Sequence, residues 1–391
     1  MFKVFKLLFK YLVYLPITNL SYWQSLYSVI KYKVLYENKN HITFFDQVSS
    51  RNNFSSLLIQ ELLKKEKIIL IVGDKKHIAF KNQNQNQNLI VLFLDQSVII
   101  LFKLLKIKFM ITFDSGFSPK IKSKDTYIIH LFHSIVSINH IYKNGSFDGY
   151  DVFFMVGPHH EKELLDMEKN RNWTNKKYIP IGYPKLDILI KNNNKQIYKK
   201  NNQITILFAP SWGNNNILKL EGINIINKVL NLGFNIIVRP HPNSFIYDKL
   251  IIQQINEICK INKQCILENS NFALMDSYVT SDLLISDWSG AAYEYAFGLL
   301  KPVLFIDTPR KINNNSKVEI NKLPMEVVCR EKIGKITSMD QFEKNISLIL
   351  NESNWKEKIK KVRKNYIFNP GNATKVAIEE IYKLRNKYNE R

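Results

Sequence analysis

The sequence predicts an α/β protein with two Rossmann-like halves. Short apolar runs of strand length recur along the 391 residues, with helical stretches between them. This pattern is typical of parallel sheets with crossover helices. A chain of this length exceeds the size at which one core usually keeps growing, so two domains are expected. Hydrophobic residues make up 45% of the chain, which is enough to form two packed cores.

Ten strands are expected, in two sets. The first set covers Lys67–Val72, Leu89–Leu94, Phe109–Phe113, Tyr127–Leu131 and Val152–Val156. The second set covers Ile204–Phe208, Asn235–Val238, Cys265–Glu268, Leu283–Ile285 and Val303–Ile306. The polar stretch KNNNKQIYKKNNQ, residues 191–203, lies between the sets and is interpreted as an interdomain linker. We therefore expect one domain over 31–190 and another over 204–391, the second closed by C-terminal helices.

The first 30 residues are expected to form a separate N-terminal segment. The stretch MFKVFKLLFKYLVYLPI mixes lysines with apolar residues at helical spacing, which is typical of an amphipathic helix on an anionic membrane surface. Lys3, Lys6 and Lys10 interrupt the apolar run, so it is not expected to span the bilayer. It also lacks the cleavage site of a signal peptide. A first helix packed on the core is the alternative.

The composition sets limits on partners and location. The net charge of +22 favours polyanions or anionic surfaces, including nucleotide diphosphates and anionic lipid. No known nucleic-acid-reading motif accompanies the charge, so nucleic acid is not an expected partner. Cys259, Cys265 and Cys329 show no disulfide framework and no zinc-site spacing, which favours a reducing cytoplasm. No metal or other cofactor is expected.

Glycine, proline and polar residues follow nearly every predicted strand. They include Gly73, Asp114, His133, Gly157, Pro210, Arg239, Asp287 and Asp307. In open α/β sheets, ligands bind beyond the carboxyl ends of the strands. Two such domains facing each other would enclose a single cleft.

The segment 283–307 predicts a phosphate site, because it combines a strand, a polar turn, a helix and a second strand. The turn holds Ser286, Asp287, Ser289 and Gly290. Free backbone N–H groups and the helix dipole favour a phosphate at such a turn. Glu294 follows one helical turn later, where it could point toward the cleft. Helix capping by Ser286 or Asp287 is the structural alternative.

The VRPHP motif supplies charge at a neighbouring strand end. Arg239 can contact an anion at any pH, and His241 can donate a hydrogen bond to a phosphate or protonate a leaving group. Pro210 and Ser211 follow another strand of the second set and are assigned to the same nucleotide diphosphate site. A surface turn without ligand contacts is the alternative for VRPHP.

His133 is the expected general base. It stands where a predicted strand gives way to a loop, and imidazole has a suitable pKa to take the proton of an attacking hydroxyl. His130 falls inside the strand and is interpreted as structural, while His140 stays ambiguous. For His159 and His160, which follow Gly157-Pro158, a helix start is favoured over a metal pair.

Four motifs together resemble the CDP-glycerol glycerophosphotransferase family of teichoic-acid and capsule polymerases. They are GYPKLD, APSWG, RPHP and SDWSGAAYEYAFGLLKPVLFID, in that order along 182–307. The resemblance implies a GT-B fold, with an N-terminal acceptor domain and a C-terminal nucleotide-donor domain. It also implies a catalytic histidine at His133, a diphosphate-binding histidine at His241, and nucleotide-binding positions at Asp287 and Ser289. The family pattern has glycine after the first histidine, where this chain has Ser134.

The resemblance implies transfer of glycerol phosphate or a related polyol phosphate from a CDP-activated donor to a cell-surface glycan. Expected partners are that donor, a glycan or lipid-linked acceptor and an anionic membrane, with the enzyme on the cytoplasmic face. A nucleotide-sugar glycosyltransferase uses the same strand-end logic and is the main alternative. A nucleotide-sugar 2-epimerase would share the two-domain cleft, but it would gain little from a basic amphipathic N-terminus.

Overall fold

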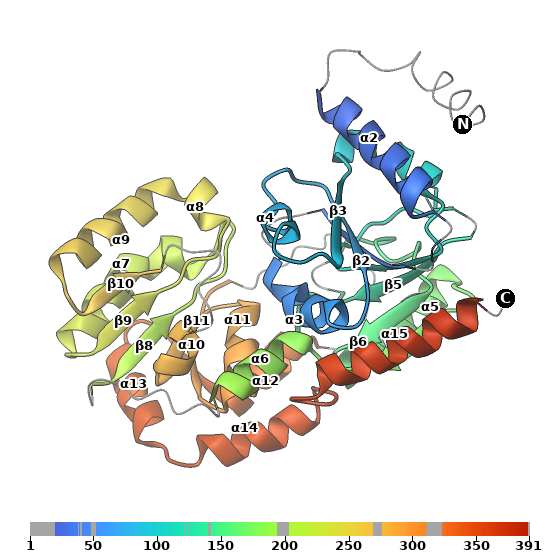
Figure 1. Cartoon of the computed structure of the whole chain (residues 1–391). Helices are drawn as coiled ribbons and strands as arrows, with labels where there is room; N and C mark the ends of the chain where they lie inside the picture. The colour runs from blue at the N-terminus through green and yellow to red at the C-terminus, as the bar shows by residue number, and fades with distance from the viewer. Residues whose placement is uncertain are drawn as a thin grey trace.

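Two lobes, each built on a parallel sheet, form the molecule (Figure 1). The computed structural model describes residues 20–37, 39, 41–47, 52–120, 122–123, 125–139, 142–193, 203–268, 276–309 and 323–389. The expected amphipathic stretch at the extreme N-terminus, His140, and most of the expected linker lie outside these residues. Among the described residues, no helix is long and apolar enough to cross a membrane.

The N-terminal lobe contains a seven-stranded sheet with the order β3-β2-β1-β4-β5-β6-β7. Its strands are β1 Ile42–Asp46, β2 Ile68–Val72, β3 Leu89–Phe93, β4 Phe109–Thr112, β5 Tyr127–Leu131, β6 Val152–Met155 and β7 Lys177–Pro180. Its helices are α2 Leu20–Leu35, α3 Asn52–Leu63, α4 Ala79–Gln83, the 3₁₀ helix η2 Gln96–Leu105, α5 Pro158–Arg171 and α6 Pro184–Asn193. Every strand pair is parallel, so all the carboxyl ends lie at one edge.

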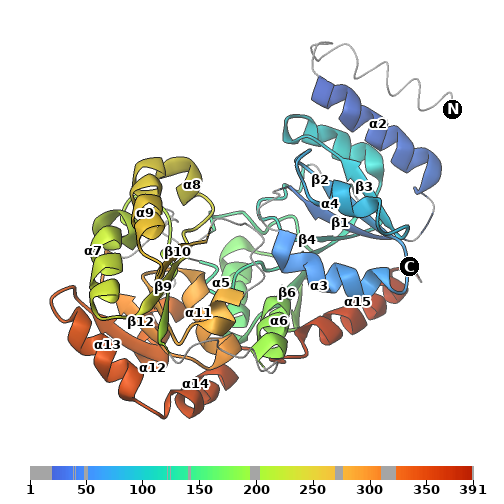
Figure 2. The same ribbon diagram turned by 60° about the vertical axis from the view of Figure 1, so that its left-hand side comes forward.

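The C-terminal lobe contains a six-stranded sheet with the order β10-β9-β8-β11-β12-β13, also parallel throughout. Its strands are β8 Thr205–Phe208, β9 Asn235–Val238, β10 Cys265–Leu267, β11 Leu283–Ser286, β12 Val303–Ile306 and β13 Gly334–Thr337. Helices α7 Ile217–Asn231, α8 Ser244–Tyr247, α9 Lys249–Ile261, α10 Asp276–Thr280, α11 Gly290–Leu299, α12 Met325–Ile333, α13 Phe342–Asn351 and α14 Trp355–Lys364 surround it. Figure 2 shows the two lobes side by side, with α6 and α11 between the sheets.

The two-domain parallel fold is confirmed, and each of the ten predicted strands has a counterpart with ends within one residue. Three strands were not predicted. Strands β7 and β13 lie at sheet edges and carry few buried residues, so their apolar signal is weak. Strand β1 is different, because all five of its residues are buried and the run ITFFD could have revealed it.

The last helix, α15 Ala373–Asn389, returns to the N-terminal lobe (Figure 1). Its apolar residues Ala377, Ile381 and Leu384 belong to the same buried cluster as strands β4 and β5. Asp187 of α6 fixes its start by accepting hydrogen bonds from the backbone N–H groups of Ala373 and Thr374 at 3.2 and 2.7 Å. The C-terminal residues therefore contact the first sheet, a placement that the sequence did not predict.

Helices α6 and α11 form the closest contact between the lobes. Gly298 of α11 lies against Leu186 and Leu189 of α6, and a Cβ atom at position 298 would stand 2.8 Å from two carbon atoms of Leu189. Glycine permits this approach because it has no side chain. The lobes therefore meet through a packed helix pair beneath the carboxyl ends of their strands.

The cysteines correct one expectation from the sequence. Cys259 near the end of α9 and Cys265 at the start of β10 form a disulfide, although their spacing matches no common motif. The chain reverses between the two elements, which brings the side chains together. Cys329 is buried and free.

Candidate active site

The loop after β8 is held by a buried carboxylate from the neighbouring strand end. Asp287, fully buried after β11, accepts hydrogen bonds from the backbone N–H and hydroxyl of Ser211, both at 2.7 Å, and from the N–H of Ile217 at 3.0 Å. Ser286 is also buried, and its hydroxyl donates to the carbonyl of Ala209 at 2.7 Å. Asp287 and Ser286 therefore shape the loop that begins at Pro210, while their polar atoms face the protein.

The N-terminus of α11 faces the loop that follows β5. Ser289 is the N-cap, and its hydroxyl accepts a hydrogen bond from the N–H of Ala291 at 3.3 Å. Gly290 begins the helix, and a Cβ atom there would stand 3.7 Å from Oγ of Ser134. Backbone N–H groups at such a helix start, together with the helix dipole, favour an anion. The structure thus brings the predicted phosphate turn close to the residue after His133.

His133 has a defined tautomer. Its Nδ1 lies 2.9 Å from the carbonyl oxygen of Phe113, and a carbonyl can only accept, so Nδ1 carries the hydrogen. The neutral ring then has its lone pair on Nε2, which lies 3.5 Å from the hydroxyl of Tyr142. A main-chain carbonyl on Nδ1 is a common way to orient an imidazole whose Nε2 takes a proton. This geometry suits a general base.

Three side chains of α5 hold the loop after His133. Nε2 of His159 donates to the carbonyl of Ile135 at 2.8 Å, and Nε2 of His160 donates to that of Val136 at 3.0 Å. Glu163 accepts from the backbone N–H groups of Ile138 and Asn139 at 2.7 and 2.9 Å. Burial lowers the pKa of His159 to about 4 and also lowers the pKa of His160, so both rings are neutral.

The expected helix start at Pro158 is confirmed, with His159 and His160 in its first turn. In the part of the chain that the structure describes, no group of three or more side chains could hold a metal ion. The loop also receives one contact from the other lobe, because Glu326 of α12 accepts a hydrogen bond from the N–H of Ser137 at 3.1 Å. Glu163 and Glu326 were not among the predicted site residues, since a loop-holding carboxylate has no motif of its own.

A buried polar bridge joins His133 to the C-terminal lobe. The hydroxyl of Tyr183 lies 2.9 Å from the carbonyl oxygen of His133 and 2.9 Å from Oε1 of Glu294. Nζ of Lys185 contacts Oε2 of the same glutamate at 2.6 Å. Burial raises the pKa of Tyr183, so its hydroxyl keeps its proton. Glu294, expected to reach the cleft, thus connects α11 to the GYPKLD motif, in which the sequence had assigned no residue a role.

Arg239 and His241 point to different neighbours. The guanidinium of Arg239 donates to the hydroxyl of Ser277 at 3.1 Å and lies 3.4 Å from the carboxylate of Glu268, with the ring of Tyr278 4.7 Å away. Burial lowers the pKa of Lys185, Glu294 opposes that effect, and the charge of Arg239 adds a smaller lowering. The charge of Arg239 is therefore partly balanced before any ligand binds.

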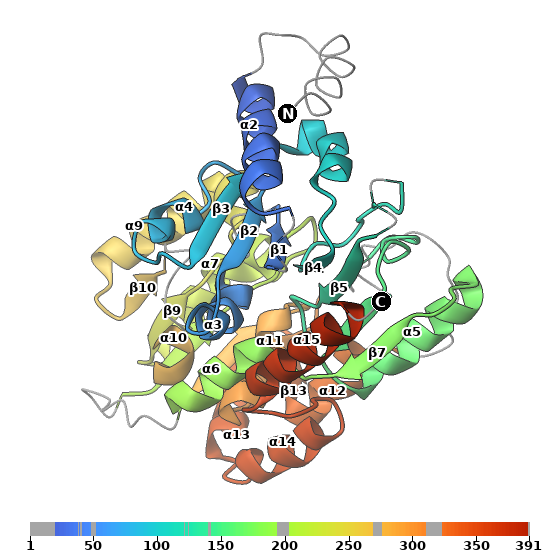
Figure 3. The same ribbon diagram turned by 45° about the vertical axis from the view of Figure 1, so that its right-hand side comes forward.

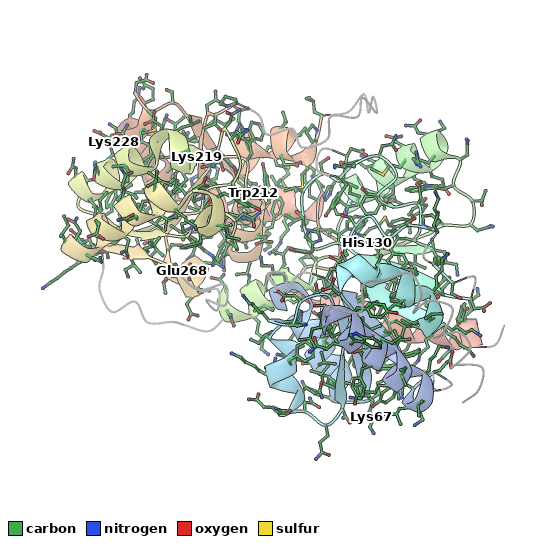
Figure 4. The ribbon with its side chains drawn as sticks, turned by 90° about the horizontal axis from the view of Figure 1, so that it is seen from above. Lys67, His130, Trp212, Lys219, Lys228 and Glu268 are labelled. Atoms are coloured by element: carbon green, nitrogen blue, oxygen red, sulfur yellow. A yellow bond between two sulfur atoms is a disulfide. The ribbon has the colours of Figure 1, made fainter. Side chains whose placement is uncertain are left out.

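His241 also has a defined tautomer, opposite to that of His133. Its Nδ1 accepts a hydrogen bond from the N–H of Asn243 at 3.1 Å, so the neutral ring carries its hydrogen on Nε2. The ring stacks on Trp212 of the β8–α7 loop at 5.6 Å. Figure 4 shows Trp212 on the side of the C-terminal lobe that faces the other lobe. His241 is thus arranged to donate a hydrogen bond, and the sequence had not assigned Trp212.

A family model described as CDP-Glycerol:Poly(glycerophosphate) glycerophosphotransferase matches residues 30–311 of this chain. The chain belongs to this family. The resemblance found in the sequence is therefore confirmed, and this glycerophosphotransferase-family member is a transferase. No curated protein sequence matches it.

Solved structures agree on the fold. A variant of the wall teichoic acid polymerase TagF aligns with a TM-score of 0.61 and 15% identity, covering 95% of this chain and 99% of that one. The variant soaked with CDPG aligns with a TM-score of 0.59 and 14% identity, covering 93% of this chain and 94% of that one. The UDP-GlcNAc 2-epimerase from Methanocaldococcus jannaschii aligns with a TM-score of 0.55 and 15% identity, covering 88% of this chain and 99% of that one. At these identities the likeness establishes the two-domain GT-B-like fold alone.

We predict that Tyr183→Phe destabilises this glycerophosphotransferase-family member. The variant leaves a buried carboxylate and a carbonyl without the hydroxyl between them, which should cost roughly 1–3 kcal/mol of unfolding free energy. Urea denaturation followed by circular dichroism measures the loss. The control is Tyr247→Phe, because Tyr247 is 71% exposed. Equal stability of the two variants would show that the bridge does not hold the lobes together.

We predict a graded effect at His241 on the binding of a nucleoside diphosphate. A hydrogen bond to a charged phosphate contributes roughly 1.5–3 kcal/mol, so His241→Ala should weaken affinity about tenfold to a hundredfold. His241→Gln keeps an N–H donor near the Nε2 position, so its affinity should lie between those of the parent protein and His241→Ala. Calorimetric titration with CDP measures the three affinities. Unchanged affinity in His241→Ala with lost turnover would instead make His241 a general acid.

Proposed function

We propose that this enzyme transfers glycerol phosphate, or a related polyol phosphate, from CDP-glycerol or its analogue to a hydroxyl of a cell-surface glycan. The acceptor would belong to capsule, lipopolysaccharide or teichoic-acid-like polymer synthesis. One observation carries the proposal within this family: a histidine with its lone pair on Nε2 stands in a loop packed against the start of α11. The two halves of a phosphoryl transfer, a base and an anion-binding helix end, thus lie together.

The reaction is a direct displacement at the β-phosphorus of the donor. The acceptor oxygen attacks that phosphorus while its proton passes to Nε2 of His133. The bond between the β-phosphorus and the bridging oxygen breaks, and the electron pair leaves with that oxygen on CMP. The acceptor then carries a new phosphodiester to glycerol. Position and charge stabilisation account for the rate, and no covalent enzyme intermediate is required.

Three groups of the C-terminal lobe bind the donor diphosphate in this proposal. The start of α11, with the Ser289 hydroxyl, offers N–H and O–H donors to one phosphate. The Nε2 hydrogen of His241 takes another phosphate oxygen, and Arg239 adds fixed positive charge. Charge grows on the departing CMP, so these donors bind the transition state more strongly than the ground state. Asp287 and Glu294 act as positioning residues behind them.

The enzyme is proposed to work at the cytoplasmic face of the cell membrane, on an acceptor held there. Helix α2 supports this location. It packs on the lobe through Tyr22, Leu26, Val29 and Tyr32. Large apolar side chains on its other side stay exposed, namely Leu20, Trp23, Tyr27, Val34 and Leu35. Apolar residues at the lipid boundary together with nearby lysines are typical of interfacial helices.

The deciding experiment measures which nucleotide is released. The purified enzyme is incubated with a glycan acceptor and with CDP-glycerol, CDP-ribitol or a nucleotide sugar. Phosphate transfer releases CMP, whereas glycosyl transfer releases CDP or UDP. We expect CMP, and we expect His133→Ala to lower its release by about 10²–10⁴-fold with donor affinity near normal. Release of a nucleoside diphosphate, or full activity in His133→Ala, would contradict the proposal.

We predict that Trp23→Ser together with Tyr27→Ser weakens binding to anionic liposomes at low salt by about tenfold. The two aromatic rings would lose apolar area that the bilayer boundary would otherwise cover. Liposome flotation measures the change. A matched control replaces Tyr247 and Leu250, which are exposed on α8 and α9 of the other lobe. If the control loses as much binding as the α2 variant, α2 is not the docking helix.

A further inference from the structure

We propose that a shallow groove over α12, β13 and α14 binds the anionic chain that this enzyme extends. The groove has a volume of about 420 Å³, and four lysines line it, Lys332, Lys335, Lys358 and Lys361. Glu331 and Glu352 are the acidic residues in its lining. The inference rests on the proposed function, because a chain joined by phosphodiesters carries one negative charge at each link.

Helix α14 presents an almost uniformly basic face. Its apolar residues Trp355 and Ile359 are buried, and its outward positions are dominated by exposed lysines, Lys356, Lys358, Lys360, Lys361 and Lys364. Glu357 is the one acidic residue in the helix. The face carries no large exposed apolar side chain. It therefore fits a soluble polyanion better than the boundary of a lipid bilayer, where apolar residues are needed.

The groove concentrates lysines whose charge no carboxylate in the described part of the chain neutralises. Some lysines elsewhere contact a carboxylate nearby, as Lys64 does with Glu61 and Lys383 with Glu380. In the groove, Lys358 contacts Glu352, whereas Lys332, Lys335 and Lys361 have no carboxylate partner among the described residues.

The lysines of α14 also repel one another because of their spacing along the helix. Lys356 and Lys360 are four residues apart, as are Lys360 and Lys364, and Lys358 lies three residues before Lys361. Like charges at these spacings face each other and destabilise a helix. Basic residues in the last turn do favour the helix dipole, which applies to Lys361 and Lys364 of α14 and to Lys332 of α12. That effect falls off within one turn and does not reach Lys356 of α14 or Lys335 of β13. A polyanion bound in the groove would remove the repulsion between Lys358 and Lys361, the two α14 lysines that line it.

Only a chain of several units can reach from the candidate active site to the groove. Arg363 of α14 donates to the carbonyl of Phe297, near the far end of α11, at 2.7 Å. The start of α11 at Gly290 faces Ser134, so the two ends of this helix connect the sites. Seven residues of helix span about 10 Å. An acceptor of one unit would stop short of the groove, whereas a chain of several units can occupy it.

The position of α14 indicates which negative charges the groove binds, those of the polymer or those of the membrane. Helix α14 lies at the end of the molecule opposite α2 (Figure 3). A bilayer that docks on α2 would therefore not cover the groove. The phosphates that occupy it belong to the growing chain.

The test compares a groove variant with a control of equal charge. The groove variant carries Lys332→Gln, Lys335→Gln, Lys358→Gln and Lys361→Gln. The control carries glutamine at four other exposed lysines, Lys162, Lys169, Lys249 and Lys263. Fluorescence anisotropy measures binding of labelled poly(glycerol phosphate) to the full-length proteins. We expect the groove variant to bind about tenfold more weakly at low salt and with a smaller salt dependence, and the control to change little.

A kinetic arm uses acceptors of different length. With a single-unit acceptor, kcat/KM should be unchanged in the groove variant, while with a long chain KM should rise by about the same factor as the anisotropy Kd. Thermal unfolding checks the fold, and the pair Lys332→Gln with Lys335→Gln, which leaves α14 intact, replaces the quadruple variant if that unfolds.

Each contrary outcome has a distinct meaning. Equal losses of affinity for poly(glycerol phosphate) in the groove variant and the control would mean that net charge alone explains the effect, and would overturn the groove proposal. A groove variant that loses binding to phosphatidylglycerol vesicles while keeping that to poly(glycerol phosphate) would assign the surface to lipid and overturn it as well. Transfer without any length dependence would overturn the groove and leave the proposed function standing. Absence of CMP release with every acceptor would overturn the proposed function itself.

Discussion

The ion pair between Lys185 and Glu294 is the contact on which the relative placement of the two lobes at the active site depends. Both side chains are largely buried, with 12% and 7% of their areas exposed, so each charge needs its partner. Tyr183 donates within the same cluster and reaches the carbonyl of His133. A helix of the C-terminal lobe is thereby tied to the main chain of the expected base. Movement of α11 would be transmitted to His133 through two polar contacts, from Glu294 to Tyr183 and from Tyr183 to the carbonyl of His133.

Buried carboxylates play a similar part throughout the site. Asp287 holds the loop after β8, Glu163 holds the loop after His133, and Glu326 adds a bond from the other lobe. Each accepts from backbone N–H groups that would otherwise be buried without a partner, a situation that is costly in a folded protein. The backbone N–H groups of loops at strand ends are beyond the hydrogen bonds that pair neighbouring strands. The acidic side chains supply the missing acceptors and so hold the loops that carry the candidate site residues.

Two histidines acquire opposite roles from their main-chain neighbours. The carbonyl of Phe113 places a hydrogen on Nδ1 of His133 and leaves Nε2 as an acceptor. The N–H of Asn243 does the reverse at His241 and leaves Nε2 as a donor. In the proposed reaction, His133 takes a proton and His241 gives a hydrogen bond to a phosphate. His159 and His160 form a third class, in which burial keeps the ring neutral and the hydrogen bond holds a loop. Histidine differs among these three settings because its surroundings determine which ring nitrogen carries a hydrogen.

The sequence by itself determined the number of sheets, ten of the thirteen strands among the described residues, the family and the strand ends that hold the candidate site. These features follow from local patterns, since apolar runs, turn residues and motifs are written in adjacent positions. Tertiary structure alone decided the partners of each side chain. Glu294 meets Lys185 across 109 residues, Asp287 meets Ser211 across 76, and α15 returns to the first sheet. Such pairings depend on how helices and strand ends converge in space, and no local pattern in the chain encodes that convergence.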